Sequence, residues 1–249
     1  MDADVARYLD DLVRAARDVL GDGLIGAYAA GSVALDAYQP GRSDVDVALV
    51  CVTPPAEPVK HELVARLRHE ALPCPARGLE LVLYTRDSAR SGTAEPGFEL
   101  ELNTGARMGF RATYAADRRP AADGRFWYAL DRSILHERGV ALFGEPAADA
   151  FAEIHDLRAP LRDALAWWLA LPGPVPDDAV LGACRSLARI RHGGWLDKIA
   201  AGRRIIADGD PDADLIARCV AARTGDGAPP DPAAARAFQR RVLAELTAP

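Results

Sequence analysis

A short run of alternating acidic and apolar residues constrains this chain more than any other segment. Residues 43–49 read Ser-Asp-Val-Asp-Val-Ala-Leu. Because side chains on a strand alternate between its two faces, Asp44 and Asp46 would share one face while Val45, Val47 and Leu49 enter a core. Two such carboxylates lie about 7 Å apart at their Cα atoms, close enough to share one or two magnesium ions that carry a nucleoside triphosphate. The run therefore predicts a strand whose aspartates are catalytic residues and metal ligands.

A glycine-serine turn stands ahead of this strand. Gly31 would let the backbone approach a phosphate group, and the hydroxyl of Ser32 can donate to phosphate oxygens. An Asp-x-Asp pair by itself is also compatible with two solvated aspartates on a surface strand. The whole pattern, Ala-Ala-Gly-Ser and later Asp-Val-Asp-Val-Ala-Leu-Val, resembles the signature of the polymerase-beta-type nucleotidyltransferase superfamily.

A candidate third carboxylate follows in the run Leu-Glu-Leu-Val-Leu-Tyr at residues 79–84, where Glu80 is the only charged residue. The run is apolar enough for a central strand, and a lone glutamate there is costly unless it meets a metal or a hydrogen-bond donor. The alternative is an edge strand on which Glu80 faces water. The superfamily places its third carboxylate on such a strand, so the resemblance implies that Glu80 is a metal ligand and the catalytic base.

Composition and charge exclude several other classes of protein. A hydrophobic content of 49% is ample for a core, and the net charge of −6 comes without any basic run that could follow a polynucleotide backbone. We therefore expect no nucleic-acid partner, and this charge is compatible with a small or cationic acceptor. The acidic N-terminus and the lack of a long apolar window predict a cytoplasmic protein with no membrane partner. The four cysteines lack Cys-x-x-Cys spacing and are expected to be reduced thiols.

The pattern of elements changes near residue 146. Before it, periodicity predicts a helix over residues 5–20, a strand over 24–30, a helix over 59–72, and a helix followed by a short strand over 126–143. Between them, the charged stretch 88–125, with Glu95, Glu99 and Glu101, indicates a solvated surface more than a substrate-binding edge. The fold class is thus an α/β mixed-sheet nucleotidyltransferase domain over residues 1–146.

Residues 147–249 are expected to form an all-α helical bundle. A helix is predicted over 150–171 with Pro160 inside it, and a second helix, capped by Asp177 and Asp178, over 177–191. Further helices are predicted after the pairs Gly193-Gly194, Asp210-Pro211 and Asp231-Pro232.

Two further blocks resemble a narrower family. They are Gly-Val-Ala-Leu-Phe-Gly at 139–144 and Ser-Leu-Ala-Arg-Ile-Arg-His-Gly-Gly-Trp-Leu-Asp-Lys-Ile-Ala at 186–200. With the blocks above they look like the aminoglycoside 3″-adenylyltransferases that modify streptomycin and spectinomycin. The resemblance implies magnesium-dependent transfer of AMP from the co-substrate ATP to an antibiotic hydroxyl, with the drug between the domains. It also implies that Arg189 and Lys198 face ATP, although helix arginines are more often in surface salt bridges.

The acceptor is the open part of this interpretation. Trp168, Asp177 and Asp178 could supply the acidic, partly aromatic surface that a cationic acceptor prefers. However, Asp-Asp-Ala-Val-Leu-Gly at 177–182 stands where the family usually has a Glu-Arg-Asn-like run. Acceptors resembling streptomycin or spectinomycin, a lincosamide, a biosynthetic intermediate, or a protein in an antitoxin-type or protein-modifying reaction therefore remain alternatives.

Overall fold

The computed structural model describes residues 1–120, 124–225 and 227–248, and it divides into two compact units, Met1–His155 and Asp156–Pro249. The division lies after His155, whereas the sequence suggested residue 146. The reason is the short helix α6 (Ala147–Ala150) and Phe151, which belong to the core of the first unit. The ring of Phe151 meets Tyr28 edge-on, with the ring centroids 5.3 Å apart.

The described residues of the first unit form one mixed sheet with the strand order β5-β4-β3-β2-β1-β6. Only β2 and β3 pair in parallel among the paired strands, and the other neighbours are antiparallel. In chain order the strands are β1 (Leu24–Ala29), β2 (Val45–Cys51), β3 (Leu79–Thr85), β4 (Phe98–Gly105), β5 (Met108–Thr113) and β6 (Val140–Gly144). The mixed sheet confirms the predicted fold class of this unit.

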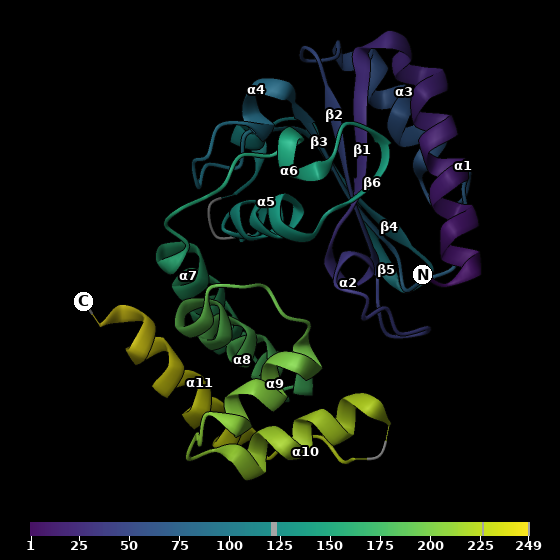
Figure 1. Cartoon of the computed structure of the whole chain (residues 1–249). Helices are drawn as coiled ribbons and strands as arrows, with labels where there is room; N and C mark the ends of the chain where they lie inside the picture. The colour runs from purple at the N-terminus through teal and green to yellow at the C-terminus, as the bar shows by residue number, and fades with distance from the viewer. Residues whose placement is uncertain (121–123, 226, 249) are drawn as a thin grey trace. The chain divides into compact units, whose positions relative to one another are not determined.

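Helices cover both faces of the sheet. Helices α1 (Ala3–Leu20) and α3 (Glu57–Leu67) lie on one face, and α4 (Arg86–Ala89), α5 (Trp127–Arg138) and α6 lie on the other (Figure 1). The short helix α2 (Gly31–Ala34) follows β1, and two 3-10 turns span Gly21–Gly23 and Ala116–Arg118.

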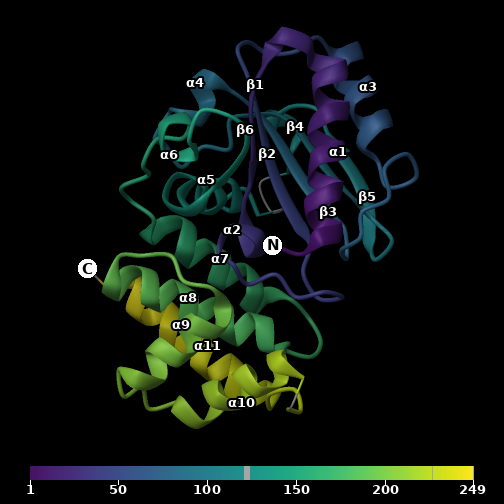
Figure 2. The same cartoon turned by 45° about the vertical axis from the view of Figure 1, so that its right-hand side comes forward.

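The alternation read from the β2 sequence explains this arrangement. Val45, Val47 and Leu49 belong to the core beneath α1 and α3, while Ala48 and Val50 belong to the core beneath α5. Asp46 is two residues from Ala48 and therefore shares its face. The predicted placement of the apolar residues of β2 in a core is confirmed. Asp46 therefore lies on the face of the sheet that packs against α5. Figure 2 shows α5 and α1 on opposite sides of the sheet.

The charged stretch 88–125 contains two strands that the sequence did not reveal. Leu100 and Leu102 of β4 are fully buried, and Glu101 between them is only 6% exposed. Glu101 accepts from Arg111 at 3.0 Å and pairs with the buried Arg119. A solvated surface is therefore the wrong description of Glu101, because partners far along the chain neutralise its charge inside the fold. Residues 121–123 of this stretch lie outside the described residues.

The described residues of the second unit form helices and connecting segments and contain no strand. It contains α7 (Arg158–Ala170), α8 (Asp177–His192), α9 (Lys198–Ala207), α10 (Ala213–Thr224) and α11 (Pro232–Thr247). The predicted helix over 150–171 is wrong at its start, since α7 begins at Arg158. Pro160 thus falls in the first turn, where its missing N–H removes no intrahelical hydrogen bond. Nor do the two aspartates cap α8, because Pro176 holds the cap position and Asp177 and Asp178 lie in the first turn.

The cysteines and the helices were also compared with the expectations from the sequence. The four cysteines, Cys51, Cys74, Cys184 and Cys219, are buried free thiols. None of the helices in the described ranges combines the length and the apolar character that a membrane-spanning segment requires.

Candidate active site

The parallel pairing of β2 with β3 brings two of the predicted carboxylates together. Asp46 lies directly opposite Glu80 in the register of these strands. Strand β3 lies between β2 and β4, so the edge-strand alternative for Glu80 is excluded. Asp44 immediately precedes β2, and its side chain is 23% exposed. The three candidate carboxylates therefore gather at one end of two central strands.

The turn at Gly31 lies against the carboxylate of Asp46. Gly31 has a φ of +51°, a left-handed conformation that side-chain-bearing residues rarely adopt. A Cβ at this position would stand 1.8 Å from Oδ2 of Asp46 and 2.5 Å from its Cγ. The backbone N–H of Ala30 also donates to the carbonyl oxygen of Asp46 at 2.9 Å. Only glycine leaves room for this contact, so the start of α2 can lie directly against the carboxylate of Asp46.

Ser32, the next residue, carries a buried hydroxyl. Its Oγ has no hydrogen-bond partner among the residues that the structure describes. A buried hydroxyl without a partner costs free energy, and most such groups in folded proteins are satisfied. A phosphate oxygen beside the turn would accept from this hydroxyl, which is the chemistry that the sequence predicted for Ser32.

Glu80 carries the strongest electrostatic signature of the site. Burial, followed by the neighbouring charges of Asp44 and Asp131, raises the pKa of Glu80 to about 7, with a smaller contribution from Glu101. The guanidinium of Arg77 lowers the pKa of Glu80 and so opposes them. A pKa in this range suits a general base that accepts a proton near neutral pH.

Asp131 of α5 is a carboxylate that sequence reasoning missed. Its charge acts on Glu80 across the space between α5 and the sheet. Nothing in the local sequence marks it, because an aspartate inside an amphipathic helix is an ordinary surface residue until the packing of that helix is known.

Arg77 is a second missed residue. Its Nη2 donates to Oδ2 of Asp44 at 2.5 Å, and its backbone N–H donates to the carbonyl oxygen of Ser43 at 3.1 Å. The register of β2 and β3 explains this contact, because it places the residues that precede one strand beside those that precede the other. An arginine just ahead of the Glu80 strand was the available signal.

The donor set of the site fits magnesium that arrives with a triphosphate. Asp44, Asp46 and Glu80 offer only carboxylate oxygens, the ligands that magnesium prefers, and the close turn at Gly31 and the buried hydroxyl of Ser32 stand beside them. In the described residues, no group of three or more His, Cys, Asp or Glu side chains is arranged to hold a metal ion by itself. Magnesium is commonly held by one or two carboxylates together with substrate phosphates, so two of these three carboxylates would suffice beside a triphosphate.

In the second unit, the structure joins two residues that the sequence assigned to different ligands. Nζ of Lys198 donates to Oδ1 of Asp178 at 3.1 Å, and Arg223 donates to the same oxygen. Burial lowers the pKa of Lys198, the charges of Arg185 and Arg223 act in the same direction, and Asp178 opposes them. Asp178 is therefore the counter-ion of a cluster of cations on α8, α9 and α10.

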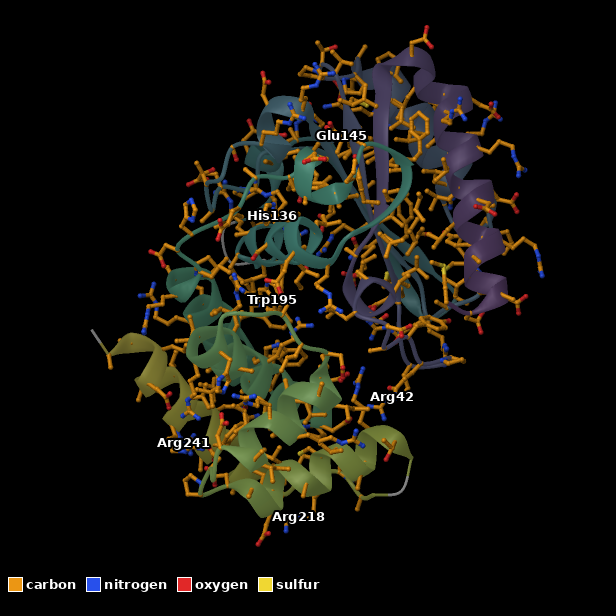
Figure 3. The ribbon with its side chains drawn as sticks, viewed as in Figure 1. Arg42, His136, Glu145, Trp195, Arg218 and Arg241 are labelled. Atoms are coloured by element: carbon orange, nitrogen blue, oxygen red, sulfur yellow. The ribbon has the colours of Figure 1, made fainter. Side chains whose placement is uncertain are left out.

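The remaining predicted residues lie on α7 and α8. The guanidinium carbon of Arg189 lies 5.5 Å from the ring centroid of the buried Trp195, which is labelled in Figure 3, and Arg185 lies at the same distance. Trp168 is half-buried near the end of α7 and meets the ring of Trp167 edge-on at 5.2 Å. Asp177 begins α8. Arg189 is thus held by an aromatic ring, a contact that the sequence did not suggest.

The contact between Gly31 and Asp46 generates a stability prediction. We expect Gly31→Ala to lower the free energy of unfolding by about 1–3 kcal/mol more than Gly41→Ala, because only the first substitution forces the carboxylate of Asp46 to move. Urea unfolding followed by tryptophan fluorescence measures both.

Gly41→Ala is a matched control, since Gly41 also has a positive φ, +80°, but a Cβ there meets nothing within 4 Å. The backbone strain is then common to both variants. Equal losses of stability in the two variants would contradict the steric role of Gly31.

The crowding of carboxylates around Glu80 generates a prediction of pH dependence. In metal-free buffer, a group whose pKa rises from 4.5 to about 7 on folding contributes stability that is complete below pH 4.5 and is lost as the pH rises through 7. Glu80→Gln removes this loss. The free energy of unfolding of Glu80→Gln minus that of the unsubstituted protein should therefore be about 1–3 kcal/mol larger at pH 8 than at pH 5.

Urea unfolding in EDTA at the two pH values provides the measurement. Glu62→Gln is the control, because Glu62 lies in an exposed ion pair with Arg66 on α3 and should show no such change. A pH-independent difference for Glu80→Gln would show that the carboxylate of Glu80 is not destabilised in the folded protein.

Comparison with known proteins identifies a shared fold. No protein-family model matches the chain, and no curated protein sequence matches it. Among solved structures, the chain is similar to spectinomycin adenyltransferase AAD(9) from Enterococcus faecialis, crystallised with ATP and spectinomycin. The TM-score is 0.72 at 14% sequence identity, and the match covers 97% of this chain and 99% of that chain. The chain thus has the fold of this adenyltransferase over nearly its whole length, as the sequence resemblance led us to expect.

Proposed function

We propose that this protein is a magnesium-dependent adenylyltransferase that moves AMP from ATP to a hydroxyl of an aminoglycoside or aminocyclitol antibiotic and releases pyrophosphate. The observation that carries the proposal is the register of β2 and β3, which sets Asp46 opposite Glu80 with the Gly31 turn against Asp46. The fold shared with a spectinomycin adenyltransferase supports the same chemistry.

The nucleotide end of the site is assigned to the first unit. The Gly31 turn lies against the carboxylate of Asp46, and the buried hydroxyl of Ser32, which has no partner in the described residues, is the proposed donor to a phosphate oxygen. Asp44, Asp46 and Glu80 are the proposed ligands of magnesium. When bound, magnesium would offset the charge of the triphosphate and make the α-phosphorus more electrophilic.

Glu80 is the proposed general base. It accepts the proton of the acceptor hydroxyl as that oxygen forms a bond to the α-phosphorus of ATP. The bond between the α-phosphorus and the bridging oxygen to the β-phosphate breaks, and pyrophosphate leaves with the electron pair. Burial and the nearby carboxylates raise the pKa of Glu80, which makes it a stronger base than an exposed glutamate. Arg77 holds Asp44 beside it.

Residues of the helical unit are assigned to the two substrates. Arg189 and Lys198 are the proposed cations for the phosphates, and Trp168, Asp177 and Asp178 are the proposed contacts of a cationic acceptor. Because Asp178 pairs with Lys198, we propose that Asp178 also positions this cation. We therefore assign Asp178 to both substrates.

The proposal is tested by measuring the release of pyrophosphate from ATP in the presence of magnesium and each member of a panel of acceptors. We expect Asp46→Asn to reduce turnover at least about 100-fold, since a ligand charge is lost while the apolar face of β2 stays intact. Glu80→Gln should reduce turnover by a similar factor, because a base contributes about 10²–10⁴-fold, yet it should retain measurable affinity for ATP in calorimetric titration.

Asp87→Asn is the control for these variants, because Asp87 is exposed on α4 and outside the proposed site. If Asp46→Asn keeps more than about a tenth of the original activity, the loss is far smaller than expected of a metal ligand, and the role of Asp46 is contradicted. Transfer to a lincosamide or to another small molecule, with no transfer to any aminoglycoside or aminocyclitol, would support adenylyl transfer and contradict the proposed class of acceptor.

The ion pair between Asp178 and Lys198 yields a separate prediction. Trp168→Ala should raise the KM of the acceptor alone. Asp178→Asn should raise the KM of ATP as well, by about fivefold, because Lys198 and Arg223 lose their shared counter-ion and a partly exposed pair contributes about 1 kcal/mol. Steady-state kinetics with each substrate varied in turn distinguishes the two patterns.

Asp214→Asn serves as the matched control, since Asp214 is exposed on α10 of the same unit. If Asp178→Asn changes only the KM of the acceptor, the pair with Lys198 does not position a phosphate-binding cation.

A further inference from the structure

Polar residues lie side by side across four neighbouring strands on the face of the sheet beneath α5. In the strand registers Asp46 of β2 is opposite Glu80 of β3, Glu80 is opposite Asn103 of β4, and Asn103 is opposite Arg111 of β5. Directly opposed residues point to the same face, with Cβ atoms about 4.5–5.5 Å apart. We call this series of four residues the polar row.

Three members of the polar row lie beside groups described above. Asp46 lies against the Gly31 backbone, Glu80 is surrounded by the charges described above, and Arg111 donates to Glu101 at 3.0 Å. The side chain of Asn103 is half-buried and makes no hydrogen bond within the part of the chain that the structure describes. Asparagine is disfavoured in strands, so an asparagine next to the proposed base calls for a functional explanation.

The direction of the reaction determines what reaches Asn103. The phosphate contacts Gly31 and Ser32 follow β1, on one side of Asp46, and Asn103 lies on the other side, beyond Glu80. In phosphoryl-type transfer the attacking and the leaving oxygen stand roughly in line on opposite sides of the phosphorus. An acceptor whose hydroxyl is held at Glu80 therefore extends away from the phosphates, over β4.

We propose that Asn103 binds the polar substituent on the carbon next to the hydroxyl that receives AMP. The inference rests on the proposed function and names a feature of its acceptor, a vicinal diol or amino alcohol. An amide offers an N–H donor and a carbonyl acceptor, so it can bind a neighbouring hydroxyl through both groups or an ammonium through its oxygen. The carboxylates of Glu80 and Asp131 favour substituents that donate hydrogen bonds or carry positive charge.

A matched pair of acceptors, one with this neighbouring group and one deoxy or deamino analogue, tests the inference. The unsubstituted protein should prefer the complete acceptor by about 10–100-fold in kcat/KM, as expected when a site built for a hydrogen bond meets a ligand that lacks it. Leucine has a volume similar to that of asparagine. In Asn103→Leu, kcat/KM for the complete acceptor should fall by most of this factor, while kcat/KM for the analogue should change by less than about threefold. The KM of ATP should stay constant.

Thr104→Val is the matched control. Thr104 is the next residue of β4 and points to the opposite face, where its Oγ1 accepts from the backbone N–H of His69 at 2.9 Å. We expect this variant to lose thermal stability and to keep its preference between the two acceptors. Asn103→Ala provides a second substitution with a smaller side chain, and the Tm of every variant is measured.

Several outcomes separate this inference from the function on which it rests. If the unsubstituted protein transfers AMP to no acceptor, the proposed function is wrong, and the role of Asn103 is wrong with it. If it transfers AMP with equal kcat/KM to the two acceptors, the inference is overturned and the proposed function stands. This outcome requires no variant. An equal loss for both acceptors in the Asn103 variants, or a raised KM for ATP, would also overturn it.

Discussion

The structure depends on one parallel pairing, that of β2 with β3. It sets Asp46 opposite Glu80 within the sheet and places the residues ahead of the two strands side by side, so that Arg77 meets Asp44. Carboxylates concentrated in this way repel one another and resist burial, which raises the pKa of Glu80 to about 7. Such an arrangement is tolerated when a cation or a proton compensates for it. The apolar residues of β2 and β3 in the two cores on either side of the sheet keep these carboxylates together.

Close pairing of opposite charges recurs elsewhere in the chain. Glu101 of β4 is buried with Arg119, and this pair secures the 3-10 turn Ala116–Arg118 to the face of the sheet that also carries Glu80. In the helical unit, Asp178 is shared between Lys198 and Arg223. Removing one member of such a group leaves the other uncompensated, so substitutions in these pairs affect more than the contact that is lost. Even Asn for Asp, which keeps the shape of the side chain, removes the charge on which the partner depends.

Sequence patterns predicted the fold where a local rule was sufficient. Alternation predicted the buried strand at 45–51, and the cap signals and proline pairs predicted most of the helices after residue 176. The patterns failed where charge hid the periodicity. In β4, Glu99 and Glu101 between apolar residues suggested a solvated surface, because their partners Lys60 and Arg119 lie 39 and 18 residues away. They also failed at residues 151–157, where apolar residues with helical spacing pack as an irregular segment.

The sequence by itself determined the chemistry available to this protein. The Gly-Ser turn, Asp44, Asp46 and Glu80 were visible as residue types at particular spacings, since strand alternation and glycine geometry are local properties. Only the tertiary structure decided which groups surround them. Asp131 approaches Glu80 because α5 packs on that face of the sheet, Asn103 stands beside Glu80 because β4 pairs with β3 in one register, and Asp178 joins Lys198 because α8 packs on α9. These neighbours depend on pairings between distant segments, and no local pattern encodes the register of a pair of strands or the face on which a helix packs.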